Sequence, residues 1–179
     1  MAKQKNFDKP RFLIGFDPSS NGFGYFVLDC QYKKPRLAEY GTVEGRVKLD
    51  SEPHSVRLAL IKAKVIELKA KYQPLYRKVF IEDGFAQFKK ETQALFRVRG
   101  VVESELVEYE LVAYKPNTIK KETTGYGHAA KGHVGQEIQR MLDIEDEEMS
   151  DDETDAGGVA VLGYNKEFTK DFPNKEVLE

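Results

Sequence analysis

Short apolar runs separated by turn-forming residues occupy the first part of the chain. Residues 12–16 (FLIGF) carry no charge and are followed by Asp17 and by turn formers at 18–22. A second apolar run at 24–28 (GYFVL) comes shortly after. Uncharged runs of this length are typical of strands buried on both faces, and a short polar turn between them is typical of a hairpin. The pattern therefore predicts two paired central strands, the first of which ends in a carboxylate.

A less regular segment and a helical pattern follow. We expect residues 37–47 to form a third strand that pairs with the second. Between residues 53 and 72 the apolar positions recur every three or four residues, as on the buried face of a helix. These positions are Leu58, Ile61, Val65, Leu68 and Tyr72. Pro74 marks the end of this helix, because proline lacks the backbone N–H that would continue it.

Strand and helix patterns then alternate along the second half of the chain. A fourth buried strand is expected at 78–82 (KVFIE), where an apolar run again ends in an acid. A helix over about 89–109, a short strand at 111–114, a loop at 115–132 and a short helix within 134–142 come next. This order predicts an α/β fold in which the first and fourth strands lie side by side and parallel.

The last helix opens with a cluster of acids. Ser150 and Glu153 match the capping box that begins a helix. Asp152 and Asp155 are three residues apart and therefore share a face of this helix, near the end where its dipole favours negative charge. The glycines that follow at 157–158 predict a close approach of the helix to the sheet, since glycine is otherwise costly inside a helix.

Carboxylates therefore arrive from three separate elements. If strands one and four are neighbours, Asp17 lies beside Glu82, and Asp152 and Asp155 can point to the same place. Oxygen ligands gathered in this way are typical of sites for hard divalent cations, which indicates a metal-dependent nuclease. Taken singly, Asp17 also fits a strand cap and Glu82 also fits a buried ion pair.

Composition narrows the class of protein. The 179 residues are 40% hydrophobic and 32% charged, which is typical of one soluble domain. We expect a single domain over 1–179, with a flexible lead at 1–10 and a C-terminal extension at 165–179. No run approaches the roughly 18 apolar residues of a membrane span, so we expect a cytoplasmic protein with no membrane partner. The single cysteine excludes an intrachain disulfide framework and a cysteine-based zinc site.

Charge is unevenly distributed along the chain. Residues 143–155 hold nine acidic residues and no basic one, whereas residues 1–142 hold 25 basic and 17 acidic residues. A basic body around a concentrated acidic segment suits a polyanion-binding surface beside a metal site. A solvated acidic loop is the simpler interpretation of the same run.

Five segments carry a family resemblance. They are GFDPSSNGFGYFVL, VFIEDGF, RVRGVVESEL, LVAYKPNTIKKETTGYGHAAKG and DDETDAGGVAV, which together span most of residues 12–162. In this order they resemble the RuvC family of Holliday-junction resolvases, in the RNase H-like (retroviral integrase) superfamily. The resemblance implies a five-stranded mixed sheet with strands 1 and 4 adjacent and helices on both faces. It also implies a homodimer that cleaves four-way DNA junctions with two Mg²⁺ or Mn²⁺ ions per active site.

The resemblance assigns the metal ligands. Asp17, Glu82, Asp152 and Asp155 correspond to the four acidic residues that bind the two ions. Asp151 is the alternative to Asp152, because it would also share a helix face with Asp155. With such a pair of ions, one activates a water molecule and the other stabilises the departing 3′ oxygen, which leaves 5′-phosphates.

Basic and aromatic residues complete the implied site. Lys120 and Lys131 fall where the family has basic residues near the cleaved phosphate, and we expect Lys131 to assist catalysis. Lys115 and Lys121 are further candidates for DNA binding, and Lys121 replaces Lys120 if the register shifts by one. The alternative for each lysine is a solvated surface position. Phe85 matches the aromatic residue that the family places against bases at the crossover, with a cap on the core as the alternative.

The chain departs from cellular members of the family in its lysine-rich lead, its longer segment between strands two and three, and its acidic stretch before Ser150. These departures indicate a phage or plasmid version. Two other functions stay open at this point. One is an RNase H-fold nuclease that acts on RNA or RNA–DNA hybrids, and the other is a non-catalytic DNA-binding module.

Overall fold

In the computed structural model, the described part of the chain comprises residues 12–18, 22–32, 34–44, 54–74, 77–84, 89–144 and 147–168. The expected lead at 1–10, Phe85 and most of the expected C-terminal extension lie outside these residues.

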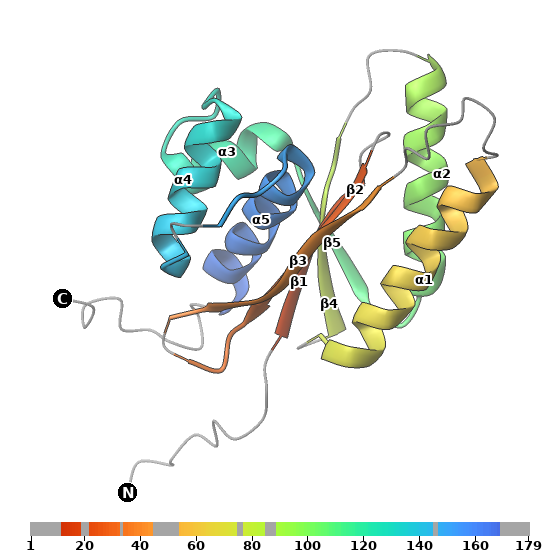
Figure 1. The fold of residues 1–179 in the computed structure, drawn as a ribbon, viewed down its shortest axis with the longest axis horizontal. Helices are drawn as coiled ribbons and strands as arrows, with labels where there is room; N and C mark the ends of the chain where they lie inside the picture. The colour runs from red at the N-terminus through yellow and green to blue at the C-terminus, as the bar shows by residue number, and fades with distance from the viewer. Residues whose placement is uncertain are drawn as a thin grey trace, which may run out of the picture.

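A five-stranded mixed sheet of order β3-β2-β1-β4-β5 forms the centre of the molecule (Figure 1). Its strands are β1 (Phe12–Pro18), β2 (Gly22–Asp29), β3 (Arg36–Glu44), β4 (Lys78–Glu82) and β5 (Glu110–Tyr114). The first three strands pair antiparallel in sequence order, whereas β4 runs parallel to both β1 and β5. The predicted adjacency of the first and fourth strands is confirmed, with Gly15 opposite Phe80 and Phe16 opposite Ile81.

Helices cover both faces of the sheet, as predicted. They are α1 (His54–Tyr72), α2 (Lys89–Glu105), α3 (Pro116–Thr124), α4 (Lys131–Leu142) and α5 (Asp151–Gly163), followed by a π-helical turn at Tyr164–Phe168. Figure 1 shows α1 and α2 on one side and α3, α4 and α5 on the other. No helix among the described residues has the length and apolar character needed to cross a lipid bilayer.

Each face of the sheet has its own hydrophobic core. Ile14 and Phe16 pack in the cluster that contains the buried side chains of α1 and α2. The side chain of Leu13 is on the opposite face of β1. It belongs to the other cluster, together with Phe80 and the buried side chains of α3, α4 and α5. This alternation along β1 is the two-residue period of a strand buried on both sides, which explains its lack of charged residues before Asp17.

Helix α5 lies very close to the sheet. A Cβ atom built on Gly15 of β1 would lie 2.7 Å from the backbone oxygen of Ala156 and 2.7 Å from the backbone nitrogen of Ala160. The close approach predicted from 157–158 is therefore present, but the strand glycines contribute as much to it. Gly157 faces the ring of Phe26 in β2, whereas Gly158 faces Ile119 of α3.

The structure corrects three predicted boundaries. Residues 115–132, expected to be a loop, contain the helix Pro116–Thr124, which begins with a proline in its first turn and ends at Gly125 with φ 81°. Only Ile119 of this helix is buried, so it has no apolar periodicity to detect. The helix expected to reach residue 109 ends at Glu105. The third strand ends at Glu44, and residues 45–47 lie outside the described part of the chain.

Candidate active site

Two neighbouring strands each deliver an acid at the same edge of the sheet. Asp17 follows Phe16 near the end of β1, and Glu82 follows Ile81 at the end of β4. Because Phe16 and Ile81 are opposite each other in parallel strands, the two acids come at the same level. Asp17 is only 6% exposed, and Glu82 is partly buried. The pairing that the sequence predicted is thus a direct consequence of the strand register.

The N-terminal end of α5 brings two further acids to this edge. The Ser150 side chain accepts a hydrogen bond from the backbone of Glu153 (3.3 Å), and Glu153 accepts one from the backbone of Ser150 (2.7 Å). This capping box, predicted from the sequence, satisfies free N–H groups and fixes where the helix begins. Asp152 and Asp155 then follow on one face, and Asp152 packs directly against the bare backbone of Gly22 in β2.

The four carboxylates act on one another electrostatically. Burial, followed by the charges of Glu82, Asp155 and Asp152, raises the pKa of Asp17 well above its ordinary value. Burial and the charge of Asp155 raise the pKa of Glu82 to about 7. Like charges gathered in a partly desolvated place disfavour ionisation, and positive charge is needed to offset them.

Lysine side chains supply part of that positive charge. Lys131, the first residue of α4, places its Nζ 2.7 Å from Oδ2 of Asp155 and 3.7 Å from Oδ2 of Asp151. Its charge lowers the pKa of both Asp17 and Glu82, against the effect of burial. Lys120, half-buried on α3, also lowers the pKa of Glu82. Both lysines therefore lie close enough to act on the acidic cluster.

Other candidate residues are less closely associated with the cluster. The side chain of Asp151 is 79% exposed, compared with 18% for Asp155. Lys115 and Lys121 are exposed at the start and the middle of α3, and neither forms an ion pair within the described part of the chain. Phe85 lies outside the described residues, so its role stays a prediction.

Two arginines near the site were not anticipated from the sequence. Arg57, half-buried on α1, is close enough to Asp152 for the carboxylate to raise its pKa, although burial lowers that pKa more. Arg99 on α2 pairs with Asp83, the residue after Glu82. No sequence signal identifies either contact, because both join segments that are distant along the chain.

The donor set fits divalent cations. Among the described residues, no three His, Cys, Asp or Glu side chains already converge around one point as a bound metal ion would require. The four acids nevertheless supply only oxygen donors, and the raised pKa of Asp17 comes partly from three other acids. Bound cations would relieve this repulsion, and oxygen-only donors are those that Mg²⁺ and Mn²⁺ prefer.

Comparison with known proteins gives one consistent family. The sequence profile of the crossover junction endodeoxyribonuclease RuvC family matches residues 13–163. RuvC of Rickettsia typhi is 32% identical over 89% of this chain and 99% of its own length. RuvC of Magnetococcus marinus is 31% identical over 88% of this chain and 86% of its own length.

Solved structures show the same fold. Thermus thermophilus RuvC superposes with a TM-score of 0.75 at 24% identity, covering 90% of this chain and 96% of that chain. The same protein in complex with a Holliday junction substrate gives a TM-score of 0.74, covering 84% of this chain and 91% of that chain. The yeast mitochondrial Holliday junction resolvase Ydc2 gives a TM-score of 0.56 at 14% identity, covering 93% of this chain and 88% of that chain. From the extent of the profile match and the identity to its relatives, the chain belongs to the RuvC crossover junction endodeoxyribonuclease family.

Proposed function

We propose that this protein is a structure-selective endonuclease that cleaves four-way DNA junctions, and other branched DNA, by metal-dependent phosphodiester hydrolysis. The observation that carries the proposal is the buried Asp17 of β1, on which the charges of Glu82 from β4 and of Asp152 and Asp155 from α5 act. A cluster of this kind is costly for folding and is typical of a site that binds cations to do chemistry.

In this proposal the four acids hold two Mg²⁺ or Mn²⁺ ions. When bound, such a pair supplies an activated water and stabilises the departing 3′ oxygen of the phosphodiester. We prefer Asp152 to Asp151 as the third ligand, because the charge of Asp152 acts on Asp17 and the side chain of Asp151 is largely exposed. The acids of the chain bind and orient the two ions. Water is the nucleophile, so no protein nucleophile is needed, and release of the 3′ oxygen leaves products with 5′-phosphates.

The lysines hold the DNA backbone in this proposal. Lys131 and Lys120 contact oxygens of the cleaved phosphate, and Lys131 assists catalysis by offsetting negative charge there; the effect of both charges on Glu82 supports this assignment. The more exposed Lys115 and Lys121 bind neighbouring phosphates. Phe85 stacks on a base at the junction centre, as the family resemblance implies.

We further propose a homodimer. A four-way junction has two equivalent strands to cut, and two active sites related by a two-fold axis account for paired, symmetric nicks. The relatives named above carry the crossover junction endodeoxyribonuclease description, and one related protein has been solved with a Holliday junction. We place the protein in the cytoplasm of a bacterial or phage-infected cell, where such DNA is found, and keep a phage or plasmid origin as part of the proposal.

A panel of labelled substrates tests the function. Four-way junctions, three-way junctions, flaps, linear duplex and RNA–DNA hybrids are incubated with wild-type protein and with Asp17→Asn, with Mg²⁺ and with EDTA. We expect paired nicks in the four-way junction that need Mg²⁺ and Asp17. Preferential cutting of the hybrid would favour the nuclease acting on RNA, and junction binding without any cutting would favour the non-catalytic module.

A further inference from the structure

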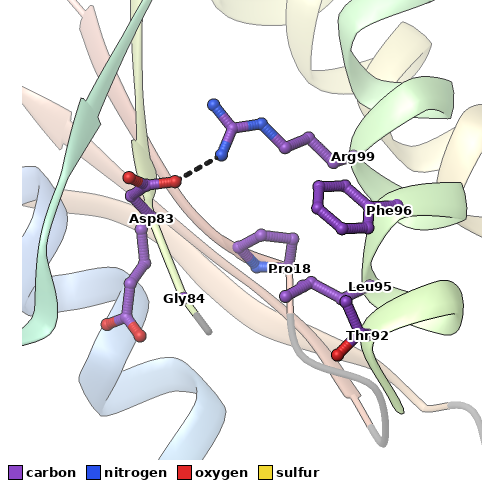
Figure 2. Close-up of a pocket in the computed structure, with 8 residues that line it drawn as sticks. Pro18, Asp83, Gly84, Thr92, Leu95, Phe96 and Arg99 are labelled. Carbon is purple, nitrogen blue, oxygen red and sulfur yellow. Dashed lines mark hydrogen bonds and ion pairs between the residues drawn. The ribbon is translucent and has the colours of Figure 1, made fainter. Parts of the chain in front are cut away.

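An ion pair links α2 to the residue that follows Glu82. Nη1 of Arg99 lies 2.6 Å from Oδ1 of Asp83, and Nε of the same guanidinium lies 2.9 Å from Oε1 of Glu103. Figure 2 shows Arg99 reaching from α2 across a pocket to Asp83. Both side chains of this pair are partly buried, with 27% and 34% of their surface exposed. The Nη1–Oδ1 pair restricts where the carboxylate of Asp83 can lie, because a planar guanidinium donates its hydrogen bonds in fixed directions.

Asp83 directly follows the end of β4, and its backbone is hydrogen-bonded to β5. Its backbone nitrogen donates a hydrogen bond of 2.8 Å to the oxygen of Tyr114, the residue opposite Glu82, so the last hydrogen bond between β4 and β5 also holds the backbone of Asp83. Successive residues of a strand point to opposite faces of the sheet. Glu82 is on the side where Asp155 of α5 raises its pKa, and Asp83 is on the side of α2. A rotation of the backbone at one of the two residues therefore changes the direction in which the side chain of the other leaves the strand.

The ion pair lies at a pocket between the strand ends and α2. It is lined by Pro18, Glu82, Asp83 and Gly84 at the strand ends and by Thr92, Leu95, Phe96 and Arg99 of α2 (Figure 2). Pro18 directly follows Asp17, so both acidic strand ends border the same hollow. Side-chain packing across a hollow is incomplete, and the Arg99–Asp83 pair bridges it.

We propose that Arg99 is a positioning residue for the metal site, acting through Asp83 on the orientation of Glu82. The inference rests on the proposed function of Glu82 as a metal ligand, and goes beyond it by assigning a role to two residues outside the ligand set. Groups hydrogen-bonded directly to metal ligands typically contribute about 10- to 100-fold to metal affinity or activity. Arg99 acts one residue further away, through Asp83, so we expect an effect at the lower end of this range. Arg99 touches neither DNA nor metal in this proposal.

Mn²⁺ affinity of the DNA-free protein, measured by electron paramagnetic resonance, is the main test. We expect Arg99→Gln and Asp83→Asn each to weaken Mn²⁺ binding by about tenfold. The double variant should be no weaker than either single variant, because both remove the same interaction. Glu103→Gln is the matched control: it removes the other partner of Arg99 and should bind Mn²⁺ like wild type. Binding of a four-way junction in EDTA should not change in any of these variants.

Wild-type Mn²⁺ affinity in the single variants, or a double variant weakened by the product of the two single effects, would overturn the proposal. If Arg99→Gln does not fold by circular dichroism, the nearly isosteric Asp83→Asn decides alone. The result is separable from the proposed function. If the wild-type protein binds Mn²⁺ but cuts no junction, the proposed function is refuted, and the Mn²⁺ affinities of the variants still test the positioning role. If the wild-type protein binds no Mn²⁺, both proposals are refuted.

Discussion

The ammonium group of Lys131, the first residue of α4, lies 2.7 Å from Oδ2 of Asp155, the fifth residue of α5. The same charge lowers the pKa values of Asp17 and Glu82. Lys131 therefore serves the acidic cluster as an internal counter-ion. In the proposed function, cations held by the acids take over this role and leave the ammonium available to a phosphate oxygen.

Replacement of this counter-ion should affect cleavage more than folding. We expect Lys131→Ala, and to a smaller extent Lys120→Ala, to slow single-turnover junction cleavage, while the free energy of unfolding changes by less than about 1 kcal/mol. The slope of the logarithm of the junction-binding constant against the logarithm of the salt concentration should become shallower by up to about one unit for each phosphate that the variant no longer neutralises. Lys62→Ala is a suitable control, because Lys62 on α1 is similarly exposed and pairs with Glu105. Cleavage and salt dependence equal to those of this control would assign both lysines to the solvated surface.

Amide substitutions in the acidic cluster should separate activity from stability. Asp17→Asn, Glu82→Gln and Asp155→Asn are each expected to nearly abolish nicking in Mg²⁺, because they lose the charge that holds cations. Junction binding should survive or strengthen, since repulsion of the phosphate is reduced. For Asp17→Asn and Glu82→Gln, the metal-free thermal midpoint should stay the same or rise, because like-charge repulsion is relieved. Asp143→Asn, at a position 76% exposed in an ion pair with Lys34, is the control. Wild-type single-turnover rates in the cluster variants would show that the site is wrongly assigned.

The two neighbouring aspartates at the start of α5 should differ in effect. Asp152→Asn is expected to remove Mg²⁺-dependent cleavage, because the charge of Asp152 acts on the buried Asp17. Asp151→Asn should reduce it by less than about tenfold, because Asp151 is largely exposed and its only described ion pair is the 3.7 Å approach to Lys131. Mg²⁺ titrations of the cleavage rate for both variants make the comparison, and the reverse order would assign the ligand role to Asp151.

Glu82 should give the metal-free protein a pH-dependent stability. Its pKa in the folded protein is about 7, against an ordinary value of 4.5, so between these values the folded state holds a proton that the unfolded state lacks. The contribution of Glu82 to the free energy of unfolding is therefore fully present below pH 4.5 and is lost as the pH rises through 7. We expect the whole loss, from below pH 4.5 to about pH 8, to be about 3 kcal/mol.

Urea unfolding of wild type and Glu82→Gln in EDTA, at about pH 5 and about pH 8, measures this contribution. Groups that Glu82 does not influence cancel in this comparison, so the difference between the two pH dependences reports Glu82 together with its coupling to Asp17. Identical pH dependences would mean that Glu82 ionises normally in the folded protein.

Phe85 should distinguish a junction resolvase from a general nuclease. Stacking on an unpaired base is worth about 1–3 kcal/mol, so Phe85→Ala should slow four-way-junction cleavage markedly while leaving a folded dimer. Sizing by light scattering and nick mapping on both strands provide the measurements. A monomer that nicks linear duplex as readily as junctions, with no response to Phe85→Ala, would leave only a metal-dependent nuclease of this fold.

Much of this fold could be predicted because its central strands are buried on both faces. Such strands must be almost free of charge, so the acids at their ends stand out, and the parallel neighbours then place Asp17 and Glu82 together. The capping box made the start of α5 predictable for a similar reason, since it is a local pattern. Helix α3 escaped prediction because it buries one residue. The ion pairs of Lys131 and Arg99 escaped it because surface charges pair across distances in sequence that no local pattern encodes.

Glycines on β1 and β2 fix the position of α5, and with it the position of the helix acids relative to the strand acids. At Gly22 and Gly24 any added Cβ would collide with Asp152, and at Gly15 it would press on the backbone of α5. The distance between the strand acids and the helix acids is thus fixed by backbone contacts. At Gly15 and Gly24 the main chain of the strand lies against the main chain of α5, so the sizes of core side chains do not set this distance. Hydrophobic residues elsewhere can be exchanged for others of similar volume without changing this distance. One methyl group at Gly24 would wedge the helix outward and pull the acids apart, so the smallest substitutions in the protein should be among the most damaging to its chemistry.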